Sequence, residues 1–262
     1  MAARTGRFSA STPNVQNLPR GAMRRVIVAG EGCQLISADY SQIEIRVAAV
    51  VSGEERMLEA YRQGQDLHEK TASLILGKSI VDVTDEERRL AKAVNFGLLF
   101  GQSAKGLVEY AANTYDVYLS EKEAHQFRDA FFRAYPALRA WHERMRRAAN
   151  EGAEEARTLL GRRRQIPAGT KWWPRFTTLI NTPVQGTASD GMKQALWELR
   201  SRLPESAKLV SMIHDEVIIE VPSDLATTEL LALVRQCLVD GMQSMLPTVP
   251  IEVDPHFSES WN

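Results

Sequence analysis

Residues 37–46 read SADYSQIEIR, and residues 33–36, which are apolar apart from Gln34, lead directly into them. A short apolar run of this kind is typical of a buried strand, so we expect a strand that ends at Asp39 and a helical segment around Glu44. A carboxylate at the end of a buried strand costs free energy unless a positive charge lies beside it. A metal ion is a common partner for such an acid, and Asp39 is therefore a candidate metal ligand.

A second stretch of the same character covers residues 208–222. We interpret it as two apolar strands joined at a bend that carries His214, Asp215 and Glu216. If the strands of both stretches are neighbours in one sheet, Asp39 and Asp215 converge on a pair of hard cations.

The composition is that of an ordinary globular protein, with 262 residues, 44% hydrophobic and 25% charged. The formal net charge of −1 does not indicate nucleic-acid binding, whereas basic runs at 24–25, 144–147 and 162–164 do. For 144–147 alone, a solvated helix face is the simpler interpretation. Cys33 and Cys237 show no zinc-type spacing and indicate reduced, buried thiols.

No apolar run reaches the length of a membrane span, and the N-terminus lacks the apolar region of a signal peptide. We therefore expect a soluble intracellular protein with no membrane partner, cytoplasmic and at the nucleoid if the source is bacterial or viral.

A stripe of four side chains follows a helix start at Thr84, whose spacing to Glu87 is that of a capping box. Every fourth residue then belongs to the stripe, which comprises Arg88, Lys92, Phe96 and Phe100. Residues four apart share one helix face, so cations at one end and aromatic rings at the other suit a polyphosphate attached to a flat heterocycle. The alternative, solvated cations beside core phenylalanines, stays open on this evidence.

The remaining pattern alternates helices with short extended segments. We expect a strand at 24–29, two helices in 44–61 separated at Gly53, a capping box at 120–123, and a basic hairpin at 159–167. Residues 171–174 are expected to form a loop with exposed tryptophans, and residues 249–253 the last strand. Asn181 and Gln185 lie four apart on a later helix, where their amides suit base edges or sugars, although singly each is an ordinary surface residue. This order predicts an α+β sheet lobe split by a mostly helical lobe.

Taken together, these motifs resemble those of the family A DNA polymerases, the DNA polymerase I family. Residues 39–46, the Arg88 stripe with Gly97 and Gly101, and residues 214–216 are similar to its motifs A, B and C. Shorter signatures agree in order, at 5–7, 13–19, 66–68, 161–164 and 181–187. The resemblance covers almost the whole chain, and three long motifs in sequence make it specific.

The resemblance implies a right-hand polymerase fold, with an antiparallel-sheet palm formed by residues 1–65 and 177–262 and helical fingers by residues 66–176. It further implies that Asp39, Asp215 and the Tyr40 carbonyl hold two Mg²⁺ ions, with Mn²⁺ as an alternative. Glu216 would be a supporting catalytic carboxylate, and Lys92 the proton donor to pyrophosphate.

Other roles follow by the same resemblance. The incoming deoxynucleotide would be bound by Arg88, Lys92, Phe96, Phe100, His68, Glu44 and Gln42. Glu44 would fill the space of a ribose 2′-hydroxyl, which indicates a DNA rather than an RNA polymerase. Primer and template DNA would be held by Arg7, Asn181, Gln185 and His214.

The chain also departs from the family pattern. Phe100 stands where the family usually has tyrosine, so we expect stacking to persist and fidelity to change. Thr177 stands where the family usually has arginine, which removes one expected duplex contact. In relatives a thumb, and before it an exonuclease or exonuclease-like domain, precede the segment at 5–7. We therefore expect weak DNA binding, distributive synthesis, no proofreading, and a separate thumb-bearing or exonuclease polypeptide as a further partner.

Template-directed addition of deoxynucleotides to a primer 3′ end is the predicted function. The alternative is a non-catalytic DNA-binding or accessory subunit that keeps the palm fold, although unpaired buried acids are a cost that such a protein need not carry. A metal-dependent nuclease would also use two carboxylates but would not account for the stripe on the Arg88 helix.

Overall fold

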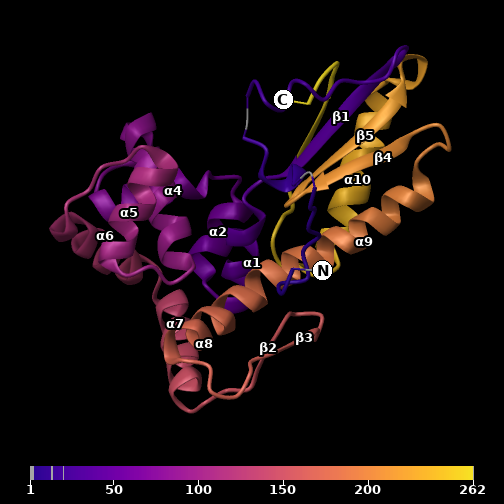
Figure 1. Cartoon of the computed structure of the whole chain (residues 1–262). Helices are drawn as coiled ribbons and strands as arrows, with labels where there is room; N and C mark the ends of the chain where they lie inside the picture. Colours follow the sequence, from indigo (N-terminus) through magenta and orange to yellow (C-terminus); the bar gives the residue numbers. More distant parts are fainter. Residues whose placement is uncertain (1–2, 13, 20, 262) are drawn as a thin grey trace. The chain divides into compact units, whose positions relative to one another are not determined.

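The computed structural model describes residues 3–12, 14–19 and 21–261. Pro13, the first residue of the signature at 13–19, lies outside them. The chain forms two compact units, which we call the sheet unit, Met1–Ile43 with Gln185–Asn262, and the helical unit, Glu44–Val184 (Figure 1). The polymerase subdomain boundaries expected at 65/66 and 176/177 stay a prediction; these compact units divide instead at 43/44 and 184/185.

The sheet unit is built on four antiparallel strands in the order β4-β5-β1-β6. Their bounds are β1 Cys33–Tyr40, β4 Lys208–Ile213, β5 Glu216–Pro222 and β6 Val253–Ser258. The strand ending in Asp39 and the strands around the His-Asp-Glu bend are therefore neighbours, as the sequence required for the two acids to meet. Short helical turns lie at Val15–Asn17 (η1) and Ser223–Leu225 (η4).

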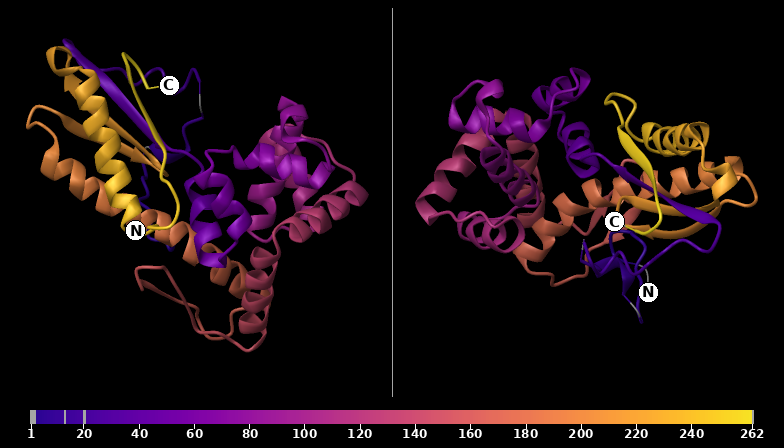
Figure 2. Two further views of the ribbon diagram at one scale, coloured as in Figure 1. Left: turned by 180° about the vertical axis from the view of Figure 1, so that it is seen from behind. Right: turned by 90° about the horizontal axis from the view of Figure 1, so that it is seen from above.

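Two helices, α9 (Thr187–Arg202) and α10 (Thr228–Gln243), pack together and cover one face of the sheet (Figure 2). Side chains alternate across a strand, so Tyr40 and Asp39 point to opposite faces. Tyr40 lies on the helix face, where its hydroxyl donates to the Leu238 carbonyl at 2.6 Å. Asp39 consequently points to the other face, which the helices leave open.

Part of that second face is closed by chain ends. Leu35, Ile218 and Trp261 are almost fully buried there, and Leu18 and Ile27 pack against them. The N-terminal segment thus packs on this face of the sheet and does not add a strand to it. The strand expected at 24–29 is wrong, because this part forms turns with a single bridge between Val28 and Ser260.

The helical unit contains helices α1 to α8. Only Ile43, the first residue of α1, belongs to the sheet unit. Their bounds are α1 Ile43–Ser52, α2 Glu55–Arg62, α3 Leu67–Leu76, η2 Ile80–Asp82, α4 Asp85–Leu99, α5 Ala104–Tyr115, α6 Glu121–Ala134, α7 Pro136–Asn150 and α8 Trp172–Asn181. A two-stranded ribbon, β2 (Glu155–Arg157) with β3 (Arg163–Gln165), completes the unit.

Local signals placed most of these helices correctly. Both capping boxes are present, with Thr84 paired to Glu87 and Ser120 paired to Glu123. Gly53 separates α1 from α2 and has a φ of +69°, a left-handed conformation that glycine adopts without strain. These helix ends were confirmed because each depends on residues within four positions of one another.

Three other expectations were wrong in part. The basic hairpin exists, but its strands lie at 155–157 and 163–165, so residues 158–162 form its loop. Residues 172–174 begin α8 instead of a loop, since a helix tolerates Pro174 in its first turn. The last strand lies at Val253–Ser258 and not at 249–253, because Val249 and Ile251 are buried in the core ahead of it.

Candidate active site

Asp39 and Asp215, the two expected metal-binding acids, lie on backbone segments that are hydrogen-bonded to each other in the sheet unit. Asp39 lies opposite Glu216 in the β1–β5 register. The Tyr40 N–H donates to the Asp215 carbonyl at 3.3 Å, so the end of β1 is bonded to the bend between β4 and β5. Burial raises the pKa of the Tyr40 hydroxyl, and the nearby Asp215 carboxylate raises it further.

Asp215 sits in a two-residue turn with His214, between Ile213 and Glu216. His214 has a φ of +54°, a left-handed backbone conformation that costs a non-glycine residue about 1 kcal/mol. Gln16 holds this turn from the N-terminal segment. Its amide nitrogen donates to the Met212 carbonyl at 2.6 Å, and its amide oxygen accepts from the His214 N–H at 3.3 Å. The signature at 13–19 thus positions Asp215 through Gln16.

Arg7 supplies a positive charge beside this turn. Burial lowers the pKa of the Arg7 guanidinium, and the charge of Asp215 opposes that shift. The preceding residue is fixed to α9, where the Ser189 hydroxyl donates to the Gly6 carbonyl at 2.8 Å. A small recess is lined by Arg7 and Asp215 together with His214, so these expected DNA and metal ligands lie together in one unit.

Glu216 faces a buried network instead of solvent. One carboxylate oxygen accepts from Arg24 at 3.0 Å, and the other accepts from the indole nitrogen of Trp261 at 2.9 Å. The Arg24 guanidinium also lies 4.1 Å from the Trp261 ring centroid. Both oxygens of Glu216 are therefore bonded to residues from the two ends of the chain, which suits a residue that fixes the strand beneath Asp215.

The donor chemistry at the ends of β1 and β5 suits hard divalent cations. The Asp39 and Asp215 carboxylates and the Tyr40 carbonyl all offer oxygen, the atom that Mg²⁺ and Mn²⁺ prefer. Within the described part of the chain, no three His, Cys, Asp or Glu side chains are grouped so as to hold a metal by themselves. The three oxygen donors from Asp39, Asp215 and Tyr40 suit an ion that keeps several coordination positions for water and for substrate oxygens.

In the helical unit, the four-residue stripe occupies one partly open face of α4 and its C-cap. Lys92 is exposed, and Arg88, Phe96 and Phe100 are half-buried. The phenylalanines are thus not core residues, which removes the main support for the alternative interpretation of the stripe. Gly97 lies on another side of α4, where a Cβ atom would come within 2.7 Å of Leu107 on α5, so this glycine allows two helices to approach closely.

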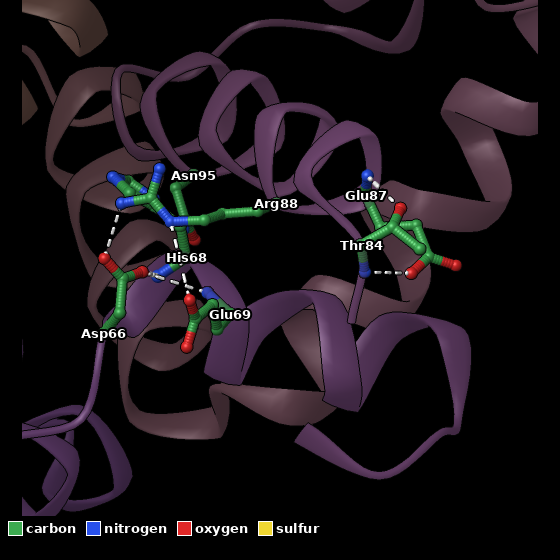
Figure 3. A network of polar contacts seen from close by, with 7 residues as sticks. All are labelled: Asp66, His68, Glu69, Thr84, Glu87, Arg88 and Asn95. Atoms are coloured by element: carbon green, nitrogen blue, oxygen red, sulfur yellow. Dashed lines mark hydrogen bonds and ion pairs between the residues drawn. The ribbon is translucent and has the colours of Figure 1, made fainter. Parts of the chain in front are cut away.

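Asp66 joins the cationic end of the stripe to α3 (Figure 3). One of its oxygens caps α3 by accepting from the His68 and Glu69 N–H groups, and the other accepts from Arg88 at 2.6 Å. Burial disfavours the Asp66 carboxylate, but the bonds from Arg88 and from the helix N-terminus outweigh burial and lower its pKa. The Arg88 guanidinium is thereby held beside the N-terminus of the helix that carries His68.

A chain of hydrogen bonds orients His68. Thr71 donates to the Asn95 side-chain oxygen at 3.0 Å, which turns the Asn95 amide nitrogen toward His68 Nδ1 at 2.9 Å. The Tyr135 hydroxyl lies 2.7 Å from the Thr71 hydroxyl, and it must donate because Thr71 uses its own proton on Asn95. An amide donor leaves Nδ1 as the acceptor, so the ring carries its proton on Nε2.

Burial keeps this imidazole neutral. It lowers the pKa of His68 from 6.5 to about 4; Asp66 opposes the shift, and Lys92 and Arg88 add to it. The unfolded chain therefore binds a proton at His68 more readily than the folded chain. The contribution of this group to stability is complete above about pH 6.5 and is lost as the pH falls toward 4.

Replacing Asn95 by Asp should raise the pKa of His68 by about one unit or more, because a carboxylate would accept a proton from Nδ1 and favour the imidazolium. A ¹H NMR titration of the imidazole signals, assigned with His68→Gln, measures the shift. Asn113→Asp, at an exposed position on α5, is the matched control and should leave it unchanged. An unaltered His68 pKa in Asn95→Asp would contradict the hydrogen-bond order given above.

The two expected amide ligands lie at an irregular segment, Asn181 immediately before it and Gln185 within it. Asn181 ends α8, Gln185 lies in a π-helical turn, η3, from Thr182 to Gly186, and α9 follows directly. The Asn181 side-chain oxygen is buried and has no hydrogen-bond partner among the described residues. An acceptor without a partner is expensive, so it is suited to a ligand. Gln42 and Glu44 follow β1, with Gln42 at a φ of +52° and Glu44 in the first turn of α1.

The expected site residues thus fall into two sets. The sheet unit carries Arg7, Asp39, Tyr40, Gln42, Gln185, His214, Asp215 and Glu216, and the helical unit carries Glu44, His68, Arg88, Lys92, Phe96, Phe100 and Asn181. Sequence reasoning missed the residues that hold these side chains in place, namely Gln16, Arg24, Thr71, Asn95, Tyr135 and Trp261. Gln16 lies inside a recognised signature, and Asn95 immediately precedes Phe96, which were the only signals available for them.

The described residues contain no helix long and apolar enough to cross a membrane. Comparison with solved structures gives a close match to the polymerase domain of Pol1 from M. smegmatis in complex with DNA primer-template and dNTP. The TM-score is 0.83 at 31% identity, over 99% of this chain and 46% of that one.

Among sequences, the chain is 40% identical over 261 residues to DNA polymerase I of Aquifex aeolicus, covering 98% of this chain and 44% of that protein. It is 40% identical over 273 residues to the thermostable DNA polymerase I of Thermus filiformis, covering 99% of this chain and 31% of that protein. The chain thus spans less than half the length of these relatives. The model of DNA polymerase family A matches residues 1–262, and the chain belongs to DNA polymerase family A.

Proposed function

We propose that the chain catalyses template-directed addition of deoxynucleotides to the 3′ end of a DNA primer. The observation that carries this proposal is the backbone bond between Tyr40 and Asp215, which brings the residues of two acids to one end of the sheet. A likeness to a polymerase domain with primer-template DNA and dNTP supports the same substrates. An accessory DNA-binding subunit would need neither these acids nor the cationic stripe of α4.

In this proposal Asp39, Asp215 and the Tyr40 carbonyl hold two divalent cations, Mg²⁺ with Mn²⁺ as an alternative. When bound, such ions lower the pKa of the primer 3′-hydroxyl and neutralise the triphosphate. The primer oxygen forms a bond to the α-phosphorus while the bond from that phosphorus to the bridging oxygen breaks. The proton of the 3′-hydroxyl is lost to solvent, and Lys92 gives a proton to the leaving pyrophosphate.

The remaining residues of the helical unit bind the nucleotide. Arg88, fixed by Asp66, binds phosphate oxygens, and neutral His68 donates from Nε2. Phe96 packs against the sugar, and Phe100 provides a stacking surface at the template position. In the sheet unit, Gln42 lies beside the nucleotide, and Glu216 supports the metal-binding turn from the Arg24–Trp261 network. Primer and template are contacted by Arg7, Asn181, Gln185 and His214.

The direct test is primer extension on a primed DNA template with all four dNTPs and Mg²⁺. The proposal predicts extension that stops when EDTA removes the ion, and the distributive synthesis expected from the sequence is tested by adding a competitor trap. Retained primer-template binding without extension at any protein concentration would favour the accessory alternative.

Glu44→Ala should raise the efficiency of ribonucleotide incorporation relative to deoxynucleotides by about 100-fold, since a side chain that excludes a 2′-hydroxyl by bulk acts through repulsion. Glu44→Gln keeps the bulk and removes the charge, so it should keep the discrimination. Steady-state kcat/KM for dCTP and CTP opposite the same template base measures both variants. Equal discrimination in Glu44→Ala and the wild type would remove this role from Glu44.

A further inference from the structure

A basic groove of about 530 Å³ lies between α6 and α7 in the helical unit. Arg128 and Arg133 line it from α6, and Arg139 and Arg146 line it from α7. On each helix the lining residues recur at intervals of three and four, which places them on one face. Charged residues on one helix face are ordinarily solvated, whereas these arginines line a concave groove between two helices.

The carboxylates in the groove do not balance its charge. Glu143 binds Arg139 at 2.9 Å, and Asp129 reaches Arg128 only at 3.8 Å. Arg133 and Arg146 make no ion pair within the part of the chain that the structure describes. Burial lowers the pKa of Arg146, and the nearby charge of Arg128 lowers it further. Two guanidinium groups that repel each other in this way are stabilised by a bound anion.

The base of the groove contains a buried histidine, His142, whose ring packs against Phe132, Trp141 and Phe176. His142 is 2% exposed, and neither of its ring nitrogens has a hydrogen-bond partner among the described residues. Burial, followed by the charge of Arg146, lowers its pKa to about 4, although the nearby Leu99 backbone acts against the shift. The ring is therefore neutral at pH 7 and presents one donor and one acceptor. Because the Leu99 backbone is the only uncharged polar group that acts on this ring within the described part of the chain, a ring nitrogen of His142 can still bond to a ligand in the groove.

Flat aromatic surfaces continue from the groove along α8. Arg146 lies 5.2 Å from the centroid of the buried Phe176 ring. Trp172 stacks on the same ring at 5.4 Å with the planes 7° apart, and Trp173 lies at 5.8 Å. The tryptophans remain 38% and 44% exposed. Cations over one part of an aromatic cluster and open indole faces over another are the combination that binds unpaired bases with their phosphates.

We propose that the α6–α7 groove and the Trp172–Trp173 surface bind a single strand of nucleic acid. The arginines pair with phosphate oxygens, and the indoles stack with unpaired bases. Paired bases in a duplex present no open face to an indole, and an acidic peptide offers the arginines carboxylates but gives the indoles no bases. This proposal rests on the proposed function in one respect. The strand would be the unpaired segment of the template on which a DNA polymerase acts.

Fluorescence anisotropy with a labelled dT₁₂ oligonucleotide and a blunt 12-base-pair duplex tests this proposal on the full chain. Arg128→Gln combined with Arg146→Gln should weaken dT₁₂ binding about tenfold near 0.1 M salt. The slope of log K against log salt should fall in magnitude by about 1.4, the value expected when two phosphate contacts to a single strand are lost. Arg144→Gln with Arg147→Gln, at exposed positions on α7 outside the lining, is the matched control and should change dT₁₂ affinity less than about twofold.

The aromatic surface has its own variant. Trp172→Ala should weaken dT₁₂ binding at least about fivefold with an unchanged salt slope, because stacking depends little on ions. Thermal unfolding of each variant checks that the helical unit is intact, and Trp172→Phe serves in place of Trp172→Ala if the latter unfolds. Unchanged dT₁₂ affinity in the folded groove variants would overturn the proposal, and so would an equal loss of dT₁₂ and blunt-duplex binding.

Nucleotide incorporation separates this site from the proposed function. On a template with a one-nucleotide overhang, the groove variants should incorporate at the wild-type rate, whereas a 12-nucleotide overhang should lower the DNA KM of the wild type only. Absence of incorporation by the wild type would count against the polymerase proposal, while dT₁₂ binding would still decide the groove.

Discussion

Asp215→Asn will reduce primer extension by roughly 10³-fold or more, since a bound ion contributes several kcal/mol to the transition state of phosphoryl transfer. The same loss is expected for Asp39→Asn. Asp39 lies near the end of β1 and Asp215 in the turn between β4 and β5, and the Tyr40 N–H is bonded to the Asp215 carbonyl. Because the two carboxylates act on the same ions, the double variant should lose hardly more activity than either single variant.

Single-turnover incorporation with saturating DNA and dNTP measures this effect. Asp224→Asn, at an exposed acid of the sheet unit, is the matched control and should keep wild-type activity. DNA binding and the thermal unfolding temperature of the Asp39 and Asp215 variants should remain close to those of the wild type. Activity within tenfold of the wild type in either variant would contradict the metal-binding role of that acid.

Glu216→Ala will lower the free energy of unfolding by about 3–5 kcal/mol, because it leaves the Arg24 guanidinium buried without its anion. Arg24 and Glu216 side chains are 9% and 10% exposed, and the Trp261 indole N–H loses its acceptor as well. Glu216→Gln keeps an acceptor for Trp261 and should cost less, about 1–3 kcal/mol. A purely catalytic carboxylate would instead lower kcat and leave stability almost unchanged.

Urea unfolding beside kcat measurements separates the two roles. Trp261→Phe removes the indole N–H together with part of the ring. A double-mutant cycle with Glu216→Ala, in which the lost packing cancels, should give a coupling energy of at least about 0.5 kcal/mol. A coupling energy near zero, or a tenfold fall in kcat for Glu216→Ala at unchanged stability, would assign Glu216 to the reaction instead of the network.

The sequence predicted those parts of the fold that short segments determine. The strand before Asp39, the bend at 214–216 and both capping boxes each depend on residues within a few positions of one another. The strand at 24–29 failed for the opposite reason. Ile27 and Ala29 pack against Trp261 and the sheet, whereas Val26 and Val28 are exposed. The segment therefore follows a surface formed by distant parts of the chain instead of a ladder of its own.

The site shows the same division. Asp39, Asp215 and the α4 stripe were recognisable because their chemistry is unusual for their position in a strand or helix. Gln16 acts on residues 196 and 198 positions away, and Tyr135 reaches Thr71 across 64 positions. Glutamine, threonine and tyrosine are common residues, so only the folded chain distinguishes these supports from their neighbours. Of the groove arginines, only Arg146 was visible in the sequence as part of the basic run at 144–147, and its position opposite α6 was not.

Incorporation of a single nucleotide opposite a chosen template base is the most direct test of polymerase activity in this chain. The chain is mixed with a primer-template and Mg²⁺, and each of the four dNTPs is supplied separately, with Asp215→Asn alongside. A template-directed polymerase will add the complementary nucleotide alone, the added base will change when the template base is changed, and the variant will add none. Bound primer-template without incorporation, or incorporation that ignores the template base, would contradict this activity.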